Sequence, residues 1–456
     1  MTVDMKHWQE RLALLADKHG VPGANLAILQ DGEVSDTAYG VLNLRTGVAA
    51  TPDSVFQIGS ISKVWSATLA MQLVDEGLLD LDAPIVTYLP DFKVADADVT
   101  RTVTTRHLLT HSSGIDGDLF LDTGRGDDCV ERYVAACADL GQNHPLGATM
   151  SYCNSGYIVL GRLIEVLRGK SWDAVLRERL FTPLGLTSAG TLPEEALLHR
   201  AAVGHITPPG QELMVTPVWG IFRSAGPAGL IHATARETLA LAQLHLADGV
   251  APDGSRVISA DSAREMRRPQ VAVPDTHTLG SHWGLGWILM TWDGRDVYGH
   301  DGGTIGQSAF MRIVPEAGVA VCLLTNGGHT QDLFRDLFNE ILGELAGVQL
   351  PARLEPPAEP PAIDLKPYVG RYARESFEIT FTAADDHLVG TMKTTGELAE
   401  AVGNNEQPPV DVYPVDEDLF VGRTDDDASW TPFVFFTLDD GARYLHMGAR
   451  ATPKVD

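Results

Sequence analysis

Three short stretches of the chain carry side chains that could act together as a nucleophile, a base and hydrogen-bonding groups. The first, GSISKVW at residues 59–65, places Ser60 three positions before Lys63. On a helix this spacing puts both side chains on one face. A serine hydroxyl is a weak nucleophile, and a buried, partly neutral lysine can activate it as a base. Taken alone, the stretch also fits a Ser60 that only caps a helix and a solvated Lys63.

The second stretch, SYCNSGY at residues 151–157, adds a phenol and an amide. Tyr152 and Asn154 are two positions apart, so their side chains point the same way if the segment is extended. A phenol beside a lysine cation can act as a general base, and an amide can hold both a lysine and a substrate carbonyl. A buried tyrosine and a turn asparagine would give the same local sequence.

The third stretch, YGHDGGT at residues 298–304, combines a histidine with three glycines. Glycines in a strand-like segment allow a ligand or another backbone to approach closely. His300 could donate a hydrogen bond to a substrate carboxylate or to the Tyr152 oxygen. A structural histidine at the end of a strand is the alternative.

In their order and separation, the three stretches resemble those of the serine β-lactamase and penicillin-binding-protein-like family. The likeness is to its class-C-like branch, which includes D-aminopeptidases, esterases and peptide-cyclising thioesterases. HLLTHSSG at 107–114, GPAG at 226–229 and residues 300–307 resemble the same family, and the likeness covers roughly residues 5–348. The segment that opens with YVGRY at 368–372 resembles the lipocalin-like barrel of some members.

This resemblance implies a role for each residue. Ser60 would be the acylated nucleophile, and Lys63 and Tyr152 would share the role of general base. Asn154 would orient the lysine and the substrate. The oxyanion hole would consist of the backbone N–H groups of Ser60 and Gly303, and neither a cofactor nor a metal ion would be needed.

The resemblance departs from the family pattern at His300, which stands where the family's K-T-G motif has lysine. A histidine attracts a substrate carboxylate less strongly than a lysine does, so we expect inefficient β-lactam hydrolysis. Three further residues are candidates for substrate binding: Gly302, Trp219 and Arg450. Trp219, like Trp283 and Trp287, could line a cleft or pack in the core. Arg450 could reach a substrate carboxylate if the barrel docks over the cleft, or be solvated.

The elements that must position these residues come from both ends of the first 350 residues. Residues 5–19 have helical periodicity, and Asp31-Gly32 indicates a hairpin turn. A helix is expected from Gly59 to about Glu76, followed by a mainly helical region and then by strand-like segments at 283–292, 308–314 and 318–326. We therefore predict an α+β fold in which an antiparallel sheet is flanked by helices and a helical subdomain lies beside it.

The sequence predicts two domains and a linker. Residues 1–350 would form the β-lactamase-like serine hydrolase domain, and the Pro-rich residues 351–363 a semi-rigid linker. Residues 364–456 would form a small lipocalin-like β-barrel, because short alternating runs are separated there by turn residues. These runs are YVGRYA, FEITFTAA, HLVGTMK, DLFVGR, TPFVFFTL and ARYLHMG.

Composition excludes several classes of partner. The chain has 34 basic and 61 acidic residues and a net charge of −27, which disfavours nucleic acids and anionic membranes. It has no apolar run of transmembrane length, and the charged N-terminal residues do not resemble a secretion signal, so we expect a cytoplasmic protein if Met1 is the native start. The four cysteines are expected to be free and mostly buried.

The predicted function is an enzyme that forms an acyl-Ser60 intermediate on amide or ester bonds of small or peptide-like substrates. Water as the second nucleophile would make it a D-aminopeptidase, amidase or esterase. An amine would make it a thioesterase that macrocyclises a nonribosomal peptide. A non-catalytic penicillin-recognising or scaffold protein is the third alternative, although a scaffold would not need Lys63 or Tyr152. The sequence leaves the oligomeric state open.

Overall fold

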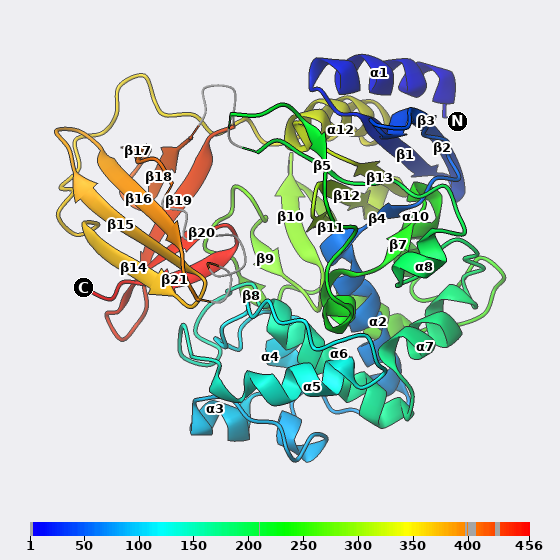
Figure 1. Ribbon diagram of the computed structural model, residues 1–456, viewed down its shortest axis with the longest axis horizontal. Coiled ribbons are helices and arrows are strands. Elements are labelled where there is room, and N and C mark those ends of the chain that lie inside the picture. The colour runs from blue at the N-terminus through cyan, green and yellow to red at the C-terminus, as the bar shows by residue number, and fades with distance from the viewer. Residues whose placement is uncertain (1–2, 209, 397–398, 400–406, 425–428) are drawn as a thin grey trace.

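The C-terminal residues form a β-sheet body beside a larger body of helices and sheet (Figure 1). This computed structural model describes residues 3–208, 210–396, 399, 407–424 and 429–456. The N-terminal helix lies on the larger body, and the C-terminus lies on the smaller one (Figure 1). The three sequence motifs at residues 59–65, 151–157 and 298–304 all belong to the larger body, whose centre is a nine-stranded sheet.

Strands from both ends of the first 350 residues form this sheet, and all its pairings are antiparallel. The strand order is β3 (Val48–Ala49), β2 (Glu33–Asn43), β1 (Gly23–Gln30), β13 (Val319–Thr325), β12 (Gln307–Val314), β11 (Arg295–Thr304), β10 (Ile288–Trp292), β9 (His282–Trp283) and β8 (Val271–Ala272). In register, Ala27 is opposite Cys322 and Gly302 is opposite Ala309. The predicted antiparallel sheet is therefore confirmed.

The hairpin predicted at Asp31-Gly32 joins β1 to β2. Both residues have positive φ, 53° and 82°, as a two-residue turn that matches the strand twist requires. Side chains of β1 alternate between two hydrophobic clusters: Leu26 and Ile28 face one, and Ala27 faces the other. The sheet is thus covered on both faces.

Helices α1 (Met5–Lys18) and α12 (Thr330–Ala346) cover one face. Helix α1 buries Trp8, Leu12, Leu15 and Ala16, which are the positions that the helical periodicity of residues 5–19 predicts. No helix in the described part of the chain combines the length and the apolar character needed to cross a bilayer. The four cysteines are free and buried, as expected.

The other face packs against a helical part of the chain that spans residues 56–265 and includes the mainly helical region predicted between residues 77 and 250. Its helices are α2 (Ser62–Asp75), α3 (Ala97–Thr102), α4 (Thr105–Leu109), α5 (Cys129–Ala136), α6 (Asn154–Arg168), α7 (Trp172–Leu176), α8 (Pro193–Ala196), α9 (Gly226–Gly229), α10 (Ala235–Leu246) and α11 (Ala260–Glu265). Two strand pairs complete it: β4 (Phe56–Gln57) with β7 (His232–Ala233), and β5 (His205–Ile206) with β6 (Met214–Val215). Helix α2 is buried from Ser62 to Leu73, so its polar side chains must find partners inside the protein.

The C-terminal body is an eight-stranded antiparallel sheet that curls into a nearly closed barrel. Its strands follow chain order: β14 (Gly370–Arg374), β15 (Phe377–Ala383), β16 (Leu388–Thr394), β17 (Val410–Pro414), β18 (Leu419–Gly422), β19 (Thr431–Thr437), β20 (Arg443–Met447) and β21 (Arg450–Pro453). A bridge between Tyr372 and Lys454 brings the first strand to the end of the last. The predicted barrel is confirmed, although β17 and β21 were not among the predicted strands.

Residues 351–363, predicted to be a linker, contain neither helix nor strand. Leu365 and Tyr368 already pack in the barrel core. We keep the division into residues 1–350, 351–363 and 364–456 as a proposal.

Replacing Trp8 with alanine should lower the free energy of unfolding by about 3–5 kcal/mol, because Trp8 is only 1% exposed between α1 and the sheet. Leu14→Ala on the same helix is the matched control, since Leu14 is 57% exposed and should change stability by less than about 0.5 kcal/mol. Urea unfolding followed by circular dichroism measures both. Equal effects would show that α1 is not anchored by its buried face.

Candidate active site

Ser60 lies in a tight turn, Gly59–Ile61, that leads directly into α2. Gly59 has a φ of +53°, and a Cβ at this position would lie 2.5 Å from the Gly303 nitrogen. Only glycine satisfies both constraints without strain. The turn thereby holds the Ser60 hydroxyl near the N-terminus of a buried helix, where the helix dipole favours developing negative charge.

The Lys63 amine points back to Ser60 from the first turn of α2. Its Nζ lies 3.1 Å from Ser60 Oγ, 2.8 Å from Asn154 Oδ1 and 2.7 Å from the Ala228 carbonyl oxygen. Burial lowers the pKa of Lys63 well below its ordinary value; the charge of Arg450 lowers it further, while Cys153 and Asp118 oppose the shift. A neutral amine beside the hydroxyl can accept its proton.

Tyr152 precedes α6 and borders the same hydroxyl. Its ring stacks on His111 at 4.2 Å between centroids and lies 4.7 Å from Lys63 Nζ. Burial raises the pKa of the Tyr152 phenol, and a hydrogen bond with Ser60 opposes this rise. The phenol is therefore protonated at neutral pH, so the electrostatics favour the lysine over the tyrosine as the resting base.

Asn154 is the first residue of α6 and does not continue an extended segment. The segment is therefore extended only up to Cys153, and the two-residue spacing of Tyr152 and Asn154 does not by itself place their side chains on one side. Both side chains nevertheless line the same cavity. The cap of α6 explains the local conformation, since Cys153 Sγ accepts a hydrogen bond from the Gly156 N–H.

His300 on β11 is 2% exposed, and burial lowers its pKa to about 3. Its Nδ1 lies 2.6 Å from the Asp301 carbonyl oxygen. A carbonyl only accepts, so Nδ1 carries the proton and Nε2 presents a lone pair. Donation from His300 to a carboxylate or to Tyr152, which the sequence suggested, requires a proton that the neutral ring does not carry on Nε2.

The glycines of β11 bring the strand against the nucleophile turn. A Cβ on Gly302 would lie 1.9 Å from the Ile58 carbonyl oxygen and 3.0 Å from the Ser60 nitrogen, whereas a Cβ on Gly303 would meet nothing within 4 Å. The strand at Gly302 and Gly303 is therefore in close contact with the turn that carries Ser60. Two oxyanion-hole donors, one from the turn and one from the strand, require such a close approach.

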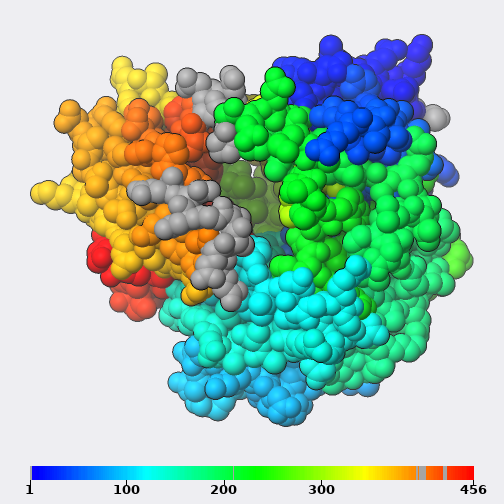
Figure 2. Space-filling view, viewed as in Figure 1, coloured from blue at the N-terminus to red at the C-terminus, as the bar shows by residue number. Residues whose placement is uncertain are grey.

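These residues line a cavity of about 390 Å³. Its lining residues are Ser60, Tyr152, Asn154, His300, Asp301, Gly302, Gly303, Ser308, Gln331 and Arg450, together with the apolar residues Leu279, Trp283, Ile288, Phe310 and Ala449. Figure 2 shows the surface hollowed between the barrel and the larger body. The cavity thus lies at the junction of the two.

The three tryptophans considered for the cleft have different positions. Trp283 lines the cavity. Trp287 is fully buried and packs edge-on against His245. Trp219 is not among the lining residues; its indole N–H donates to the Ala202 carbonyl.

The β20–β21 hairpin of the barrel reaches into the site. Its turn residues, Gly448 and Ala449, both have positive φ, and the Ala449 carbonyl accepts a hydrogen bond from the Tyr152 N–H at 2.8 Å. Arg450 follows and pairs with Asp118 through Nε and Nη2, at 2.8 and 2.7 Å. Arg450 therefore lines the cavity, where its guanidinium is paired with a carboxylate.

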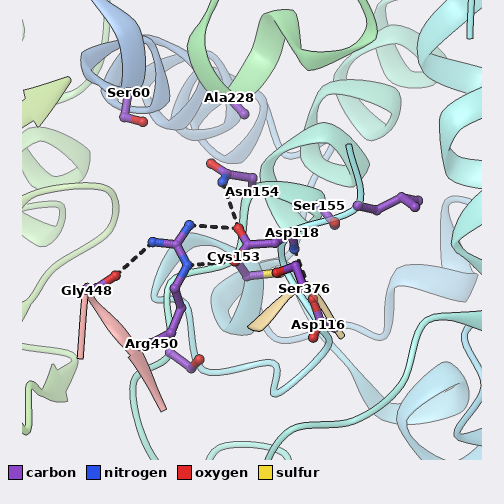
Figure 3. A network of polar contacts seen from close by, with 12 residues as sticks. Ser60, Asp116, Asp118, Cys153, Asn154, Ser155, Ala228, Ser376, Gly448 and Arg450 are labelled. Carbon is purple, nitrogen blue, oxygen red and sulfur yellow. Dashed lines mark hydrogen bonds and ion pairs between the residues drawn. The ribbon is translucent and has the colours of Figure 1, made fainter. Parts of the chain in front are cut away.

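Sequence reasoning missed Asp118, the partner of Arg450. The side chains of both converge with Asn154 in Figure 3, although they come from three separate segments. The only local signal was position: Asp118 follows the HLLTHSSG stretch at 107–114 by four residues. Such spacing does not distinguish a buried carboxylate from the many exposed ones in an acidic chain.

A family model described as Beta-lactamase matches residues 8–344. "Penicillin-binding protein 4" of Amycolatopsis lactamdurans is 54% identical over 377 residues, covering 82% of this chain and 99% of that protein. The crystal structure of SurE is similar with a TM-score of 0.78 at 29% identity over 99% of both chains, and a second SurE structure contains D-Leu. The D-amino acid amidase of Ochrobactrum anthropi SV3 shares the fold, with a TM-score of 0.62 at 24% identity over 75% of this chain and 99% of that one.

Gly302→Ala should lower the free energy of unfolding by about 1–3 kcal/mol, because the new methyl group would overlap the Ile58 carbonyl and push β11 away from the nucleophile turn. Gly303→Ala, one residue along the same strand, has open space at that position and serves as the control. Thermal unfolding of both variants provides the comparison. Equal stability of the two variants would contradict the close approach.

Proposed function

Because the chain belongs to the Beta-lactamase family of serine hydrolases, we propose that it transfers an acyl group from a peptide-like donor through a covalent acyl-Ser60 intermediate. The family membership confirms the resemblance inferred from the three motifs. The observation that carries the finer proposal is the contact between the buried Lys63 amine and the hydroxyl of Ser60, a residue that lines the cavity. A scaffold protein would have no need to bury an amine there, since burial disfavours its charged form.

Acylation would proceed by attack of Ser60 Oγ on the donor carbonyl while Lys63 accepts the hydroxyl proton. The carbonyl oxygen becomes an oxyanion that the N–H groups of Ser60 and Gly303 would stabilise by about 3–4 kcal/mol. The bond to the leaving group then breaks, and a proton from Lys63, passed on through the Tyr152 hydroxyl, would neutralise the departing group. Asn154 would hold the amine in place through Oδ1.

Donor binding would use three parts of the cavity. The edge of β11 at Gly302 and Gly303 would pair with the donor backbone, and the apolar wall around Trp283 would accept an apolar side chain. Arg450 uses three of its five N–H groups on Asp118 and the Gly448 carbonyl, so each terminal nitrogen keeps one N–H for a donor carboxylate. Trp219, away from this wall, has no role in this proposal.

The relatives support a donor with a D-configured residue, since one similar structure holds D-Leu and another is a D-amino acid amidase. With water as the acceptor, the protein would act as an amidase, D-aminopeptidase or esterase. His300 without a proton on Nε2 offers no cation to the carboxylate of a penicillin, so β-lactam turnover would be slow.

A second candidate is transfer of the acyl group to the donor's own amine, which would macrocyclise a nonribosomal peptide. One observation favours it: Ala449 and Arg450 of the barrel line the cavity. A barrel at the entrance would order a long donor and limit the access of water to the intermediate.

The purified protein should be offered p-nitrophenyl acetate, nitrocefin, D-Ala-p-nitroanilide and a peptidyl thioester that ends in a D-residue. Intact-mass spectrometry should detect an adduct on the wild-type chain and none on Ser60→Ala. If the peptidyl thioester yields a product whose mass is one water below that of the free peptide acid, the reaction is cyclisation. If it yields the free peptide acid, the reaction is hydrolysis. An adduct that persists in Ser60→Ala would refute the proposed nucleophile.

Lys63→Ala should reduce the rate of acylation at least about a hundredfold, which is the usual size of general-base assistance. The matched control is Lys93→Ala, which removes an amine from an exposed position. Single-turnover acylation by p-nitrophenyl acetate measures both. A Lys63→Ala variant that reacts at the wild-type rate would remove the lysine from the mechanism.

A further inference from the structure

A buried carboxylate lies between the barrel and the nucleophile. The Asp118 side chain is 4% exposed and accepts hydrogen bonds from two arginines of the barrel. Arg450 of β21 binds it through Nε and Nη2, and Arg374 at the end of β14 donates from Nη1 at 2.6 Å. A carboxylate with two guanidinium partners is held in one orientation.

The same carboxylate contacts the catalytic motifs on its other side. Asn154 Nδ2 donates to Asp118 Oδ1 at 3.4 Å, and Asn154 Oδ1 accepts from Lys63 Nζ at 2.8 Å (Figure 3 shows the first contact). A carboxylate can only accept, so the NH₂ end of the Asn154 amide must face Asp118, and the Lys63 amine donates to the Oδ1 that is left. The two neighbours therefore determine which end of the Asn154 amide faces the lysine, and leave one N–H of Nδ2 for the substrate.

We infer that Asp118 is a positioning residue, fixed by two arginines of the barrel, that holds the Asn154 amide in the orientation required to support Lys63. The inference rests on the proposed acyl-Ser60 chemistry and extends it, because it makes docking of the barrel a condition for an ordered catalytic centre. An amide turned end over end would place its oxygen against the Asp118 carboxylate and its NH₂ group against the amine of Lys63.

A plain structural ion pair is the alternative, and other contacts argue against it. The barrel is also anchored by the Glu375 N–H on Asp116, at 3.1 Å, and by the Ala449 carbonyl on Tyr152. Ala451 N–H adds a third hydrogen bond, to Ser151 Oγ. Docking of the barrel therefore has anchors that do not involve Asp118. The hydrogen bond donated by Asn154 Nδ2, in contrast, has Asp118 as its acceptor.

Because charged groups surround the site, this inference predicts how the pKa of the catalytic base changes when one of them is removed. Asp118 raises the pKa of both Lys63 and Tyr152, and Arg450 lowers both. Removing the carboxylate should thus lower the pKa of whichever group is the base, and removing the guanidinium should raise it. The other charged or titratable groups that face this centre are Asp116, Asp301, Cys153, His111, His300, Tyr157 and Arg374, and removal of Asp118 or Arg450 leaves all of them in place.

The test is the pH dependence of Ser60 acylation by p-nitrophenyl acetate, which has no carboxylate for Arg450 to bind. Asp118→Asn should acylate about tenfold more slowly or worse, because the amide is less ordered. The midpoint of its acid limb should move to lower pH, whereas that of Arg450→Met should move to higher pH, each by roughly half a unit or more. Loss of packing alone would not shift the two midpoints in opposite directions.

The control is Arg353→Met, which removes an arginine that pairs with Asp332 and Asp336 away from the cavity. Its midpoint should equal that of the wild type. If Asp118→Asn does not fold, Arg374→Met decides the question. This variant retains Arg450 on Asp118 but loses one positive charge, so its midpoint should rise.

The outcomes separate two failures. A wild-type chain without any acyl adduct would overturn the proposed function, and this inference with it. A wild-type chain that is acylated, with Asp118→Asn equal to it in rate and midpoint, would overturn the inference alone. Midpoints of Asp118→Asn and Arg450→Met that shift in the same direction, or an Arg374→Met midpoint that does not rise, would also overturn it.

Discussion

The burial of one amine is the constraint on which the rest of the structure depends. An ammonium group removed from water is costly unless it is neutralised or fully hydrogen-bonded. Lys63 is fully buried, and its three contacts come from the nucleophile turn, from α6 and from α9. Helices α2, α6 and α9 must therefore meet at one point, and the low pKa of the amine follows from the burial that this meeting causes.

The sheet supplies the other half of the site through close approach of backbones. Gly302 of β11 touches the nucleophile turn at a distance that no side chain could tolerate, and Gly59 meets the same strand from the opposite side. Strand β11 is also fixed by its antiparallel pairing with β12, which runs from Tyr298 to Thr304. Positioning of the reacting groups is thus a property of the rigid sheet and of the buried helices, both of which resist displacement.

The barrel is part of the wall of the cavity. Its β20–β21 hairpin contributes Ala449 and Arg450, and hydrogen bonds to Tyr152 N–H and Ser151 Oγ join the hairpin to the segment that carries Tyr152. Because the cavity lies between the two bodies, its shape on the barrel side is set by the docking of one against the other. A substrate must satisfy both surfaces at once, which is the physical basis for selectivity in the proposed reaction.

The sequence by itself determined the local elements and the order of the motifs. Periodicity predicted the helix at Met5–Lys18 and the buried positions on it, and the turn chemistry of Asp31-Gly32 predicted the first hairpin. Local signals suffice there because a repeating pattern or a positive φ is a property of neighbouring residues. The strand β17 was missed, as was β21, because these short runs lie outside the alternating patterns we recognised.

Only the tertiary structure decided which distant groups meet and in which protonation state. Asp118 and Arg450 are 332 positions apart, and nothing in their neighbourhoods marks them as partners. The tautomer of His300 depends on the Asp301 carbonyl, and its pKa depends on burial among side chains from other segments. The physical reason is that desolvation and side-chain contact are created by packing, whereas sequence spacing reports only what lies within a turn or two along the chain.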